Sequence, residues 1–186
     1  MRVLGLAGSL RRGSLNRRLL EAAAELAPSG VEVVVYDRLA EVPLFDEDLE
    51  QASGAGPEGV RRLRAAVVGA DAVLIATPEY NSSIPGVLKN ALDWASRPLA
   101  ESPVLNKPVA VLSSSTGMFG GVWAAAETRK VLGALGARTL EDTVAVAKAH
   151  ERLANGVDAT LLDELRTVVD ALGTAVRARE MARTAA

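Results

Sequence analysis

The sequence predicts a doubly wound α/β fold, a five-stranded parallel sheet with helices on both faces. Strand-like apolar runs alternate with amphipathic helical stretches along the chain. The runs VEVVVY, ADAVLIAT and PVAVLSSS are apolar on both faces. Such strands are typical of a parallel sheet that helices cover on both sides. Five successive strand–helix units therefore predict this architecture.

The same alternation gives the elements in order. The apolar run Arg2–Ala7 predicts the first strand, and the stretch from Asn16 to Ala27 the first helix. The later elements are a strand at Val31–Tyr36, a helix at Glu58–Gly69, a strand at Ala72–Thr77, a helix at Gly86–Ser96, a strand at Val109–Ser113, a helix at Gly121–Leu135, a strand within Thr139–Ala147 and a helix at Ala159–Arg179. The acidic and small residues of Asp37–Pro57 predict irregular structure. We expect one domain over residues 1–180 and a frayed tail over 181–186.

Composition excludes several classes of function. The 186 residues are 49% hydrophobic and carry a net charge of -2, which argues against a nucleic-acid or anionic-membrane partner. The sequence has no run of about 18 apolar residues and no signal-peptide pattern, so we expect a cytoplasmic protein. Cysteine is absent, which excludes disulfides and thiolate catalysis, and one histidine cannot build a zinc site.

Three unusual loops follow three of the predicted strands. They are GSLRRGSLN at 8–16, PEYNSSIPG at 78–86 and SSSTGMFGG at 113–121. In open α/β sheets, ligands bind beyond the carboxyl ends of the strands, where the strand order reverses. With the order 2-1-3-4-5, strands one, three and four are neighbours. We therefore expect the three loops to meet at one crevice.

The first loop has the chemistry of an anion site. It opens a helix, whose free N–H groups and dipole attract negative charge. Ser9, Ser14 and Asn16 can add side-chain hydrogen bonds, and Arg11 or Arg12 can add a charged one. Ser14 stands where a triphosphate-binding loop needs lysine, and the usual dinucleotide glycine pattern is absent, so a terminal monophosphate fits better. The alternative is that Ser14 only caps the helix.

The second and third loops could hold a flat ring. Pro78 and Pro85 restrict the second loop, which would let its backbone press against a ring and offer amide groups to its edge. The alternative is a structural turn, with Pro85 beginning the next helix. In the third loop, Gly117 and its neighbouring glycines permit close backbone approach, although many ordinary turns have a similar composition.

Together, these three motifs, in this order and at these separations, resemble the NADPH-dependent FMN reductase family of flavodoxin-like proteins, whose relatives reduce quinones, azo dyes and chromate. The resemblance covers nearly the whole chain. It implies that hydride passes from NAD(P)H through bound FMN to a small acceptor such as a quinone, a flavin, an azo compound or an oxyanion. No residue marks a pocket for the 2′-phosphate of NADPH, and the role of the Glu79 side chain stays open.

The resemblance also implies which residues bind FMN and which partners to expect. The implied cofactor-binding residues are Ser9, Arg11, Ser14, Leu15, Asn16, Pro78, Glu79, Tyr80, Asn81, Ser115, Gly117, Gly120 and Gly121. No side chain is expected to be catalytic, because the chemistry belongs to the flavin. Relatives form dimers or tetramers, so we expect a homodimer or homotetramer. The expected contact surface carries Leu88, Leu92, Trp94, Trp123 and Val131.

Two other functions remain open from the sequence. One is an FMN-binding electron carrier that does not itself oxidise NAD(P)H. Such carriers usually have many acidic and aromatic residues around the flavin and a strong negative charge, whereas aromatics here are 3% of residues. The other is a module that senses a phosphorylated metabolite without redox chemistry.

Overall fold

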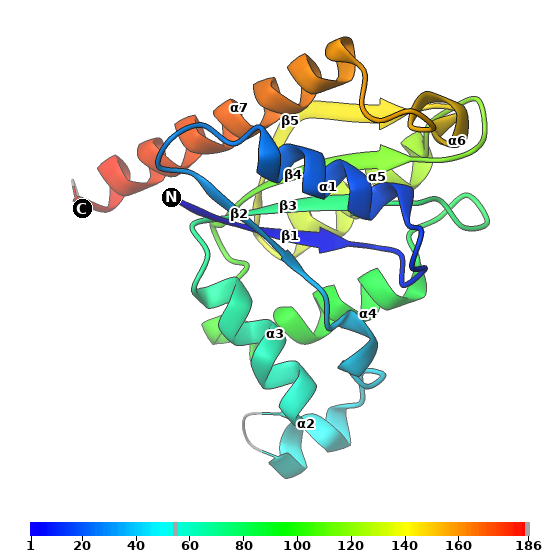
Figure 1. Ribbon diagram of the computed structural model, residues 1–186. Helices are drawn as coiled ribbons and strands as arrows, with labels where there is room; N and C mark the ends of the chain where they lie inside the picture. Colours follow the sequence, from blue (N-terminus) through cyan, green and yellow to red (C-terminus); the bar gives the residue numbers. More distant parts are fainter. Residues whose placement is uncertain (54–55, 185–186) are drawn as a thin grey trace.

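The computed structural model describes residues 1–53 and 56–184, which form one parallel sheet between two helical layers (Figure 1). The elements are β1 (Arg2–Ala7), α1 (Leu15–Glu25), β2 (Glu32–Tyr36), η1 (Leu39–Glu41), α2 (Glu47–Ser53), α3 (Glu58–Val68), β3 (Ala72–Thr77), α4 (Gly86–Ala95), η2 (Leu99–Glu101), β4 (Pro108–Ser114), α5 (Val122–Ala134), β5 (Arg138–Val146), α6 (Ala149–Arg152) and α7 (Ala159–Thr184). The strand order is β2-β1-β3-β4-β5, as predicted, and every pairing is parallel.

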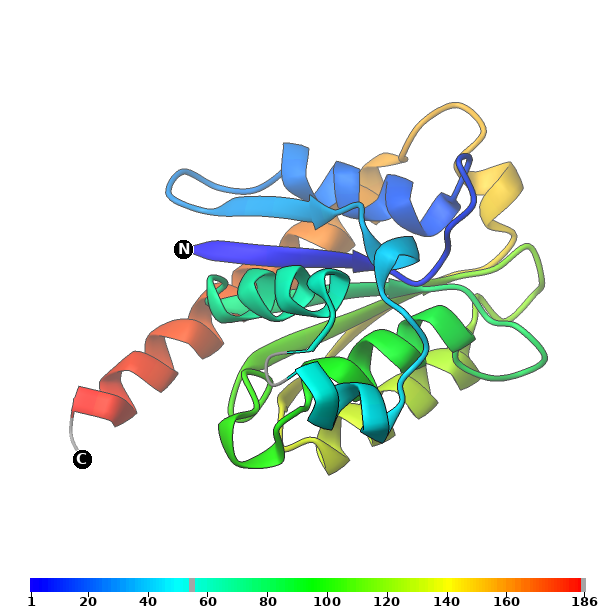
Figure 2. The same cartoon turned by 90° about the horizontal axis from the view of Figure 1, so that it is seen from below.

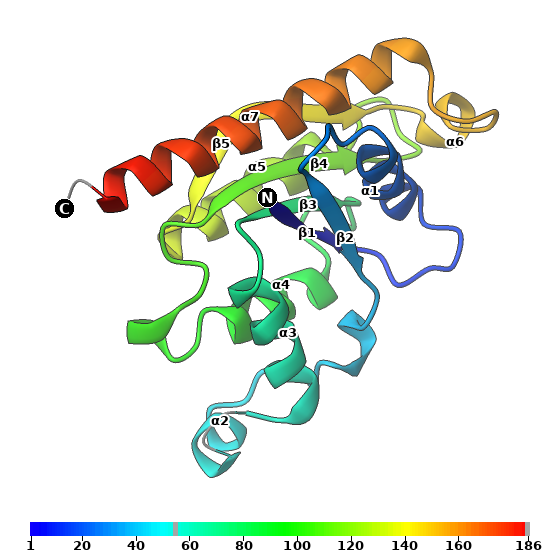
Figure 3. The ribbon, with the colours of Figure 1, turned by 60° about the vertical axis from the view of Figure 1, so that its left-hand side comes forward.

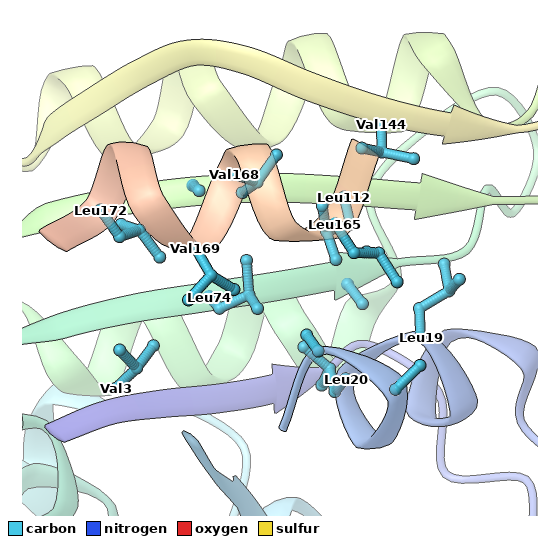
Figure 4. Close-up of a cluster of buried hydrophobic side chains, with 14 of the residues drawn as sticks. Val3, Leu19, Leu20, Leu74, Leu112, Val144, Leu165, Val168, Val169 and Leu172 are labelled. Carbon is cyan, nitrogen blue, oxygen red and sulfur yellow. The ribbon is translucent and has the colours of Figure 1, made fainter. Parts of the chain in front are cut away.

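Helices cover both faces of the sheet. On one face, leucines of α1 and α7 pack onto the strands, as Leu20 and Leu165 do around Leu74 (Figure 4). On the other face lie α3, α4 and α5, which Figure 2 shows from below. All six residues of β3 are buried. Because successive strand residues point to opposite faces, a strand covered on both sides must be apolar throughout.

Two segments differ from the predictions. Residues Glu47–Ser53, within the stretch predicted to be irregular, form the helix α2, whose first turn carries three acidic residues that the helix dipole favours. Helix α7 continues to Thr184, so residues 181–184 of the predicted frayed tail are helical, while 185–186 lie outside the described residues. Figure 3 shows α7 running along the sheet and past its end.

The expected subunit-contact surface is mostly wrong. Leu88, Leu92 and Trp94 face the core and are at most 2% exposed, and the Trp94 indole donates to the Pro43 carbonyl oxygen at 2.8 Å. Apolar side chains at helical spacing fit a core and a subunit interface equally well, so sequence alone could not separate these roles. Trp123, by contrast, is 49% exposed.

The carboxyl ends of three neighbouring strands lie side by side. Ala7 of β1 is in register with Ala76 of β3, and Thr77 is in register with Ser113 of β4. The loops that follow β1, β3 and β4 therefore leave the sheet at adjacent positions. Within the described residues, no helix is long and apolar enough to cross a membrane.

Candidate active site

The three loops meet around one cavity of about 300 Å³, which we call the first cavity. Its lining residues are Ser9, Arg11, Ser14, Leu15, Asn16, Pro78, Glu79, Tyr80, Ser114, Ser115 and Thr116. They come from the ends of β1, β3 and β4 and from the first turn of α1. The expectation that these loops share one crevice is confirmed. Nine of the predicted residues line it, and Ser114 and Thr116 line it without having been predicted.

Ser14 both caps α1 and lines the cavity. Its Oγ accepts from the Arg17 backbone N–H at 3.2 Å, so the capping interpretation is correct. The hydroxyl proton can still be donated to a ligand. The first N–H groups of α1 have no partner within the helix and, together with the dipole, favour an anion. Arg11 closes the loop by donating from Nη2 to the Gly13 carbonyl oxygen at 2.8 Å.

Two buried polar atoms of the cavity wall lack partners. Within the described chain, neither Asn16 Oδ1 nor Ser114 Oγ has a hydrogen bond. The Asn16 amide also donates to the Ser114 carbonyl oxygen at 3.4 Å, which joins α1 to β4. An unsatisfied buried polar group costs about 1–3 kcal/mol, so such groups indicate a polar ligand. The FMN side chain fits this set, because its hydroxyl groups can donate to Asn16 Oδ1 and Ser114 Oγ can donate to a hydroxyl or phosphate oxygen.

The second loop is a tight turn. Tyr80 and Ser83 exchange backbone hydrogen bonds, and both residues between them, Asn81 and Ser82, have positive φ. Asparagine tolerates this conformation better than most residues. Asn81 thus lies at the tip of the turn and does not line the cavity. The Tyr80 hydroxyl lies 3.4 Å from Ser9 Oγ and links the second loop to the first.

Two glutamates brace the second loop against α5, and we call this pair the carboxylate clamp. Glu79 Oε2 accepts from the backbone N–H groups of Trp123 and Ala124, at 3.1 and 3.2 Å. It thereby supplies the cap that Gly121, at the N-cap position, cannot. The Glu79 carboxylate is engaged at this helix end and so has a structural role.

Glu127 of α5 completes the clamp in the opposite direction. Its Oε2 accepts from the Ser83 hydroxyl at 2.6 Å and from the Ile84 backbone N–H at 3.1 Å. The hydrogen bond from Ser83, and then that from Ile84, hold the pKa of Glu127 below its usual value. Because each glutamate reaches across to the other element, the second loop and α5 are fixed as one unit.

The third loop is shaped by its contacts with β5. A Cβ on Gly120, whose φ is 65°, would lie 2.8 Å from the Ala145 backbone carbon. This glycine is therefore required by packing. Gly117, Gly120 and Gly121 border the cavity loops without lining the first cavity, so their contact with a cofactor stays a prediction.

A family model for NADPH-dependent FMN reductase matches residues 1–151. The chain belongs to the NADPH-dependent FMN reductase family. It is thus an FMN-dependent oxidoreductase that uses NAD(P)H. The first cavity is lined by nine of the residues that the resemblance implied for FMN binding.

Individual relatives span much of the chain. An NAD(P)H-dependent FMN reductase of Pseudomonas aeruginosa is 47% identical over 132 residues, 71% of this chain and 69% of the relative. A quinone reductase of Escherichia coli is 36% identical over 178 residues, 93% and 94% of the two chains. Among solved structures, the flavoenzyme NAD(P)H:(acceptor) oxidoreductase FerB from Paracoccus denitrificans superposes with a TM-score of 0.81 at 31% identity, covering 95% and 97% of the chains.

Proposed function

We propose that the chain reduces a small quinone-type acceptor with NAD(P)H at an FMN held in the first cavity. The main support for FMN binding in this cavity is a pair of buried atoms without hydrogen-bond partners among the described residues, Asn16 Oδ1 and Ser114 Oγ. They lie beside the amino end of α1, which carries the positive end of the helix dipole. The relatives from Escherichia coli and Paracoccus denitrificans, named as quinone reductase and NAD(P)H:(acceptor) oxidoreductase, support this acceptor class.

Each loop has its own part in holding FMN. The phosphate would be held at the amino end of α1, where Ser14 and Leu15 line the cavity. The second loop supports the ring through Pro78 and Tyr80. The third loop offers Ser115 to the hydroxyl chain and the polar ring edge.

When bound, FMN supplies the hydride-accepting ring. The chain would orient that ring through the second loop, which the carboxylate clamp ties to α5 by four hydrogen bonds. Backbone N–H groups of the third loop stabilise negative charge on the ring edge. The Gly117 N–H now donates to Ser115 Oγ at 3.2 Å, so this hydroxyl must turn away before Gly117 can serve the ligand.

Flavin binding to Asn16→Asp tests the phosphate position. The new carboxylate would stand beside the phosphate, so we expect the FMN dissociation constant to rise at least about tenfold. Riboflavin, which has no phosphate, should be affected less. Asn106→Asp is the matched control, because Asn106 is exposed at the opposite end of the strands and makes the same charge change. Equal FMN affinities in the two variants would remove the assignment.

Anaerobic mixing with NADPH separates the reductase from an electron carrier. A reductase bleaches the flavin absorbance within one mixing experiment and then transfers the electrons to benzoquinone. A protein that holds FMN but stays yellow under excess NADPH and NADH is the carrier. A protein that stays colourless after incubation with FMN contradicts both.

Assembly and location complete the proposal. We propose a homodimer or homotetramer in the cytoplasm. Phe119 and Trp123 support assembly, because they pack edge to face with ring centroids 5.0 Å apart while 59% and 49% exposed at the start of α5. Light scattering that finds a monomer at micromolar concentration would contradict it, and cell fractionation tests the location.

A further inference from the structure

A second cavity lies on the other side of the first loop. It has a volume of about 310 Å³ and is formed between the loop after β1 and the segment after β2. Ser9 and Arg11 line both cavities, so the two adjoin at this stretch of chain. We call the second cavity the arginine pocket. None of the roles described above uses it.

The arginine pocket has an excess of positively charged residues, although the chain as a whole is negatively charged. Three guanidinium groups line it, those of Arg11, Arg12 and Arg17, and Asp37 is the one carboxylate among its lining residues. The protein as a whole has a net charge of -2. An excess of guanidinium groups around a concave surface attracts an anion, and guanidinium pairs well with phosphate oxygens.

The neighbours of these groups leave part of the positive charge unbalanced. Arg17 pairs with Glu21 at 2.8 Å, and Asp37 lies 3.9 Å from the guanidinium of Arg38. Arg12 is exposed and forms no ion pair or hydrogen bond with the described part of the chain. Arg12 is therefore the group most available to an incoming phosphate.

The pocket also holds an unused buried donor. Tyr36 lines it, and its hydroxyl is buried without a hydrogen-bond partner among the described residues. Burial raises the pKa of Tyr36, with a smaller contribution from Glu41, so the hydroxyl keeps its proton. Leu39 adds an apolar wall. Donors beside apolar surface suit a phosphate attached to an organic body better than free inorganic phosphate.

The position after the second strand is informative. In dinucleotide-binding α/β folds, a carboxylate there binds the ribose 2′-hydroxyl of NAD, whereas a nearby arginine accommodates the 2′-phosphate of NADP. Here Asp37 follows β2, but three arginines from the first loop and α1 surround the same space.

We propose that the arginine pocket binds the 2′-phosphate of NADPH and gives the enzyme its preference for NADPH over NADH. The inference rests on the proposed function, because the nicotinamide of the same molecule must reach the first cavity. Because Ser9 and Arg11 border both spaces, one dinucleotide could reach from the arginine pocket to the first cavity past the first loop.

Direct binding to the FMN-loaded protein tests the pocket without turnover. By calorimetry, adenosine 2′,5′-bisphosphate should bind more tightly than adenosine 5′-monophosphate. Arg12→Gln should weaken the bisphosphate about tenfold, as expected for loss of a charged hydrogen bond, and leave the monophosphate unchanged. Arg138→Gln, an exposed arginine on β5, controls for the change in net charge. Inorganic phosphate that binds as tightly as the bisphosphate, and with the same dependence on Arg12, would overturn the dinucleotide assignment.

Kinetics distinguish failure of this inference from failure of the proposed function. In Arg12→Gln, kcat/KM for NADPH should fall about tenfold through KM, while kcat/KM for NADH with benzoquinone changes less than about twofold. An unchanged NADPH-to-NADH ratio overturns the pocket assignment, although quinone reduction persists. Tyr36→Phe should also lower the ratio of kcat/KM for NADPH to that for NADH. An unchanged ratio in that variant would show that the Tyr36 hydroxyl does not bind the 2′-phosphate. Loss of all reduction in the wild-type protein would instead contradict the proposed function.

Discussion

Replacing Glu79 tests the carboxylate clamp. In Glu79→Ala, the N–H groups of Trp123 and Ala124 lose a charged acceptor at 3.1 and 3.2 Å, and the amino end of α5 loses its negative charge. Hydrogen bonds to charged groups are worth about 1.5–3 kcal/mol, and charge at a helix end about 0.3–1 kcal/mol. Because water can reach the exposed Trp123 N–H, we expect a total loss of about 2 kcal/mol. For a chain of this size, that lowers Tm by about 4–8 °C.

Thermal unfolding of the flavin-free protein, followed by circular dichroism, measures this loss. Glu79→Gln keeps one acceptor oxygen but not the charge, so its Tm should lie between those of wild type and Glu79→Ala. Glu25→Gln is the control, because Glu25 is exposed and makes no hydrogen bond or ion pair with the described residues. We expect that control to stay within about 0.5 kcal/mol of wild type. If Glu79→Ala has the same Tm as Glu25→Gln, the carboxylate clamp does not stabilise α5.

Three further predictions concern other positions. Ser14→Ala removes the cap of α1 and should cost about 1 kcal/mol in urea unfolding, and FMN should raise its Tm by less than it raises that of wild type. Burial lowers the pKa of Lys107 to about 8, aided by Arg179, although its ammonium donates to the Val67 and Ala70 carbonyl oxygens. Between about pH 8 and 10.5 the unfolded chain therefore binds more protons than the folded one, and the free energy of unfolding should rise with pH. In Lys107→Met this rise should shrink, whereas an unchanged pH profile would contradict the shift. Gly120→Ala places a Cβ 2.8 Å from the Ala145 carbon at positive φ, which should cost about 1–3 kcal/mol and weaken FMN binding, and a wild-type Tm and FMN affinity would refute this packing argument.

Sequence predicted the sheet well because its three central strands, β1, β3 and β4, are almost entirely buried, whereas the edge strands β2 and β5 are partly exposed. A run such as AVLIAT at 72–77 has one polar residue, the β-branched Thr77, which also favours a strand, and its bounds match β3. Helix α2 escaped prediction because EDLEQAS shows no apolar stripe to mark a buried face. Its acidic first turn was the available signal, but acidic residues are equally common in solvated loops.

The candidate site was predictable to the level of its loops. Composition and position were enough to bring 8–16, 78–86 and 113–121 together, since parallel strands end at one edge. Individual residues were harder. Gly120 is a glycine because its backbone packs closely against β5. A glycine that packs against a ligand has the same appearance in a sequence. The partners of Glu79 lie more than 40 positions away, so no local pattern could reveal the cap.

Both ends of the described chain lie far from the cofactor cavity. Met1 precedes β1 at the amino edge of the sheet, and α7 ends beyond that same edge, whereas the three loops leave the opposite edge (Figure 1). A tether at either terminus, to an electrode or to a fused partner enzyme, would therefore leave the three loops around the first cavity facing solution. If the protein were immobilised through α7, the first cavity would face away from the support. External electron donors or acceptors could then reach it from solution.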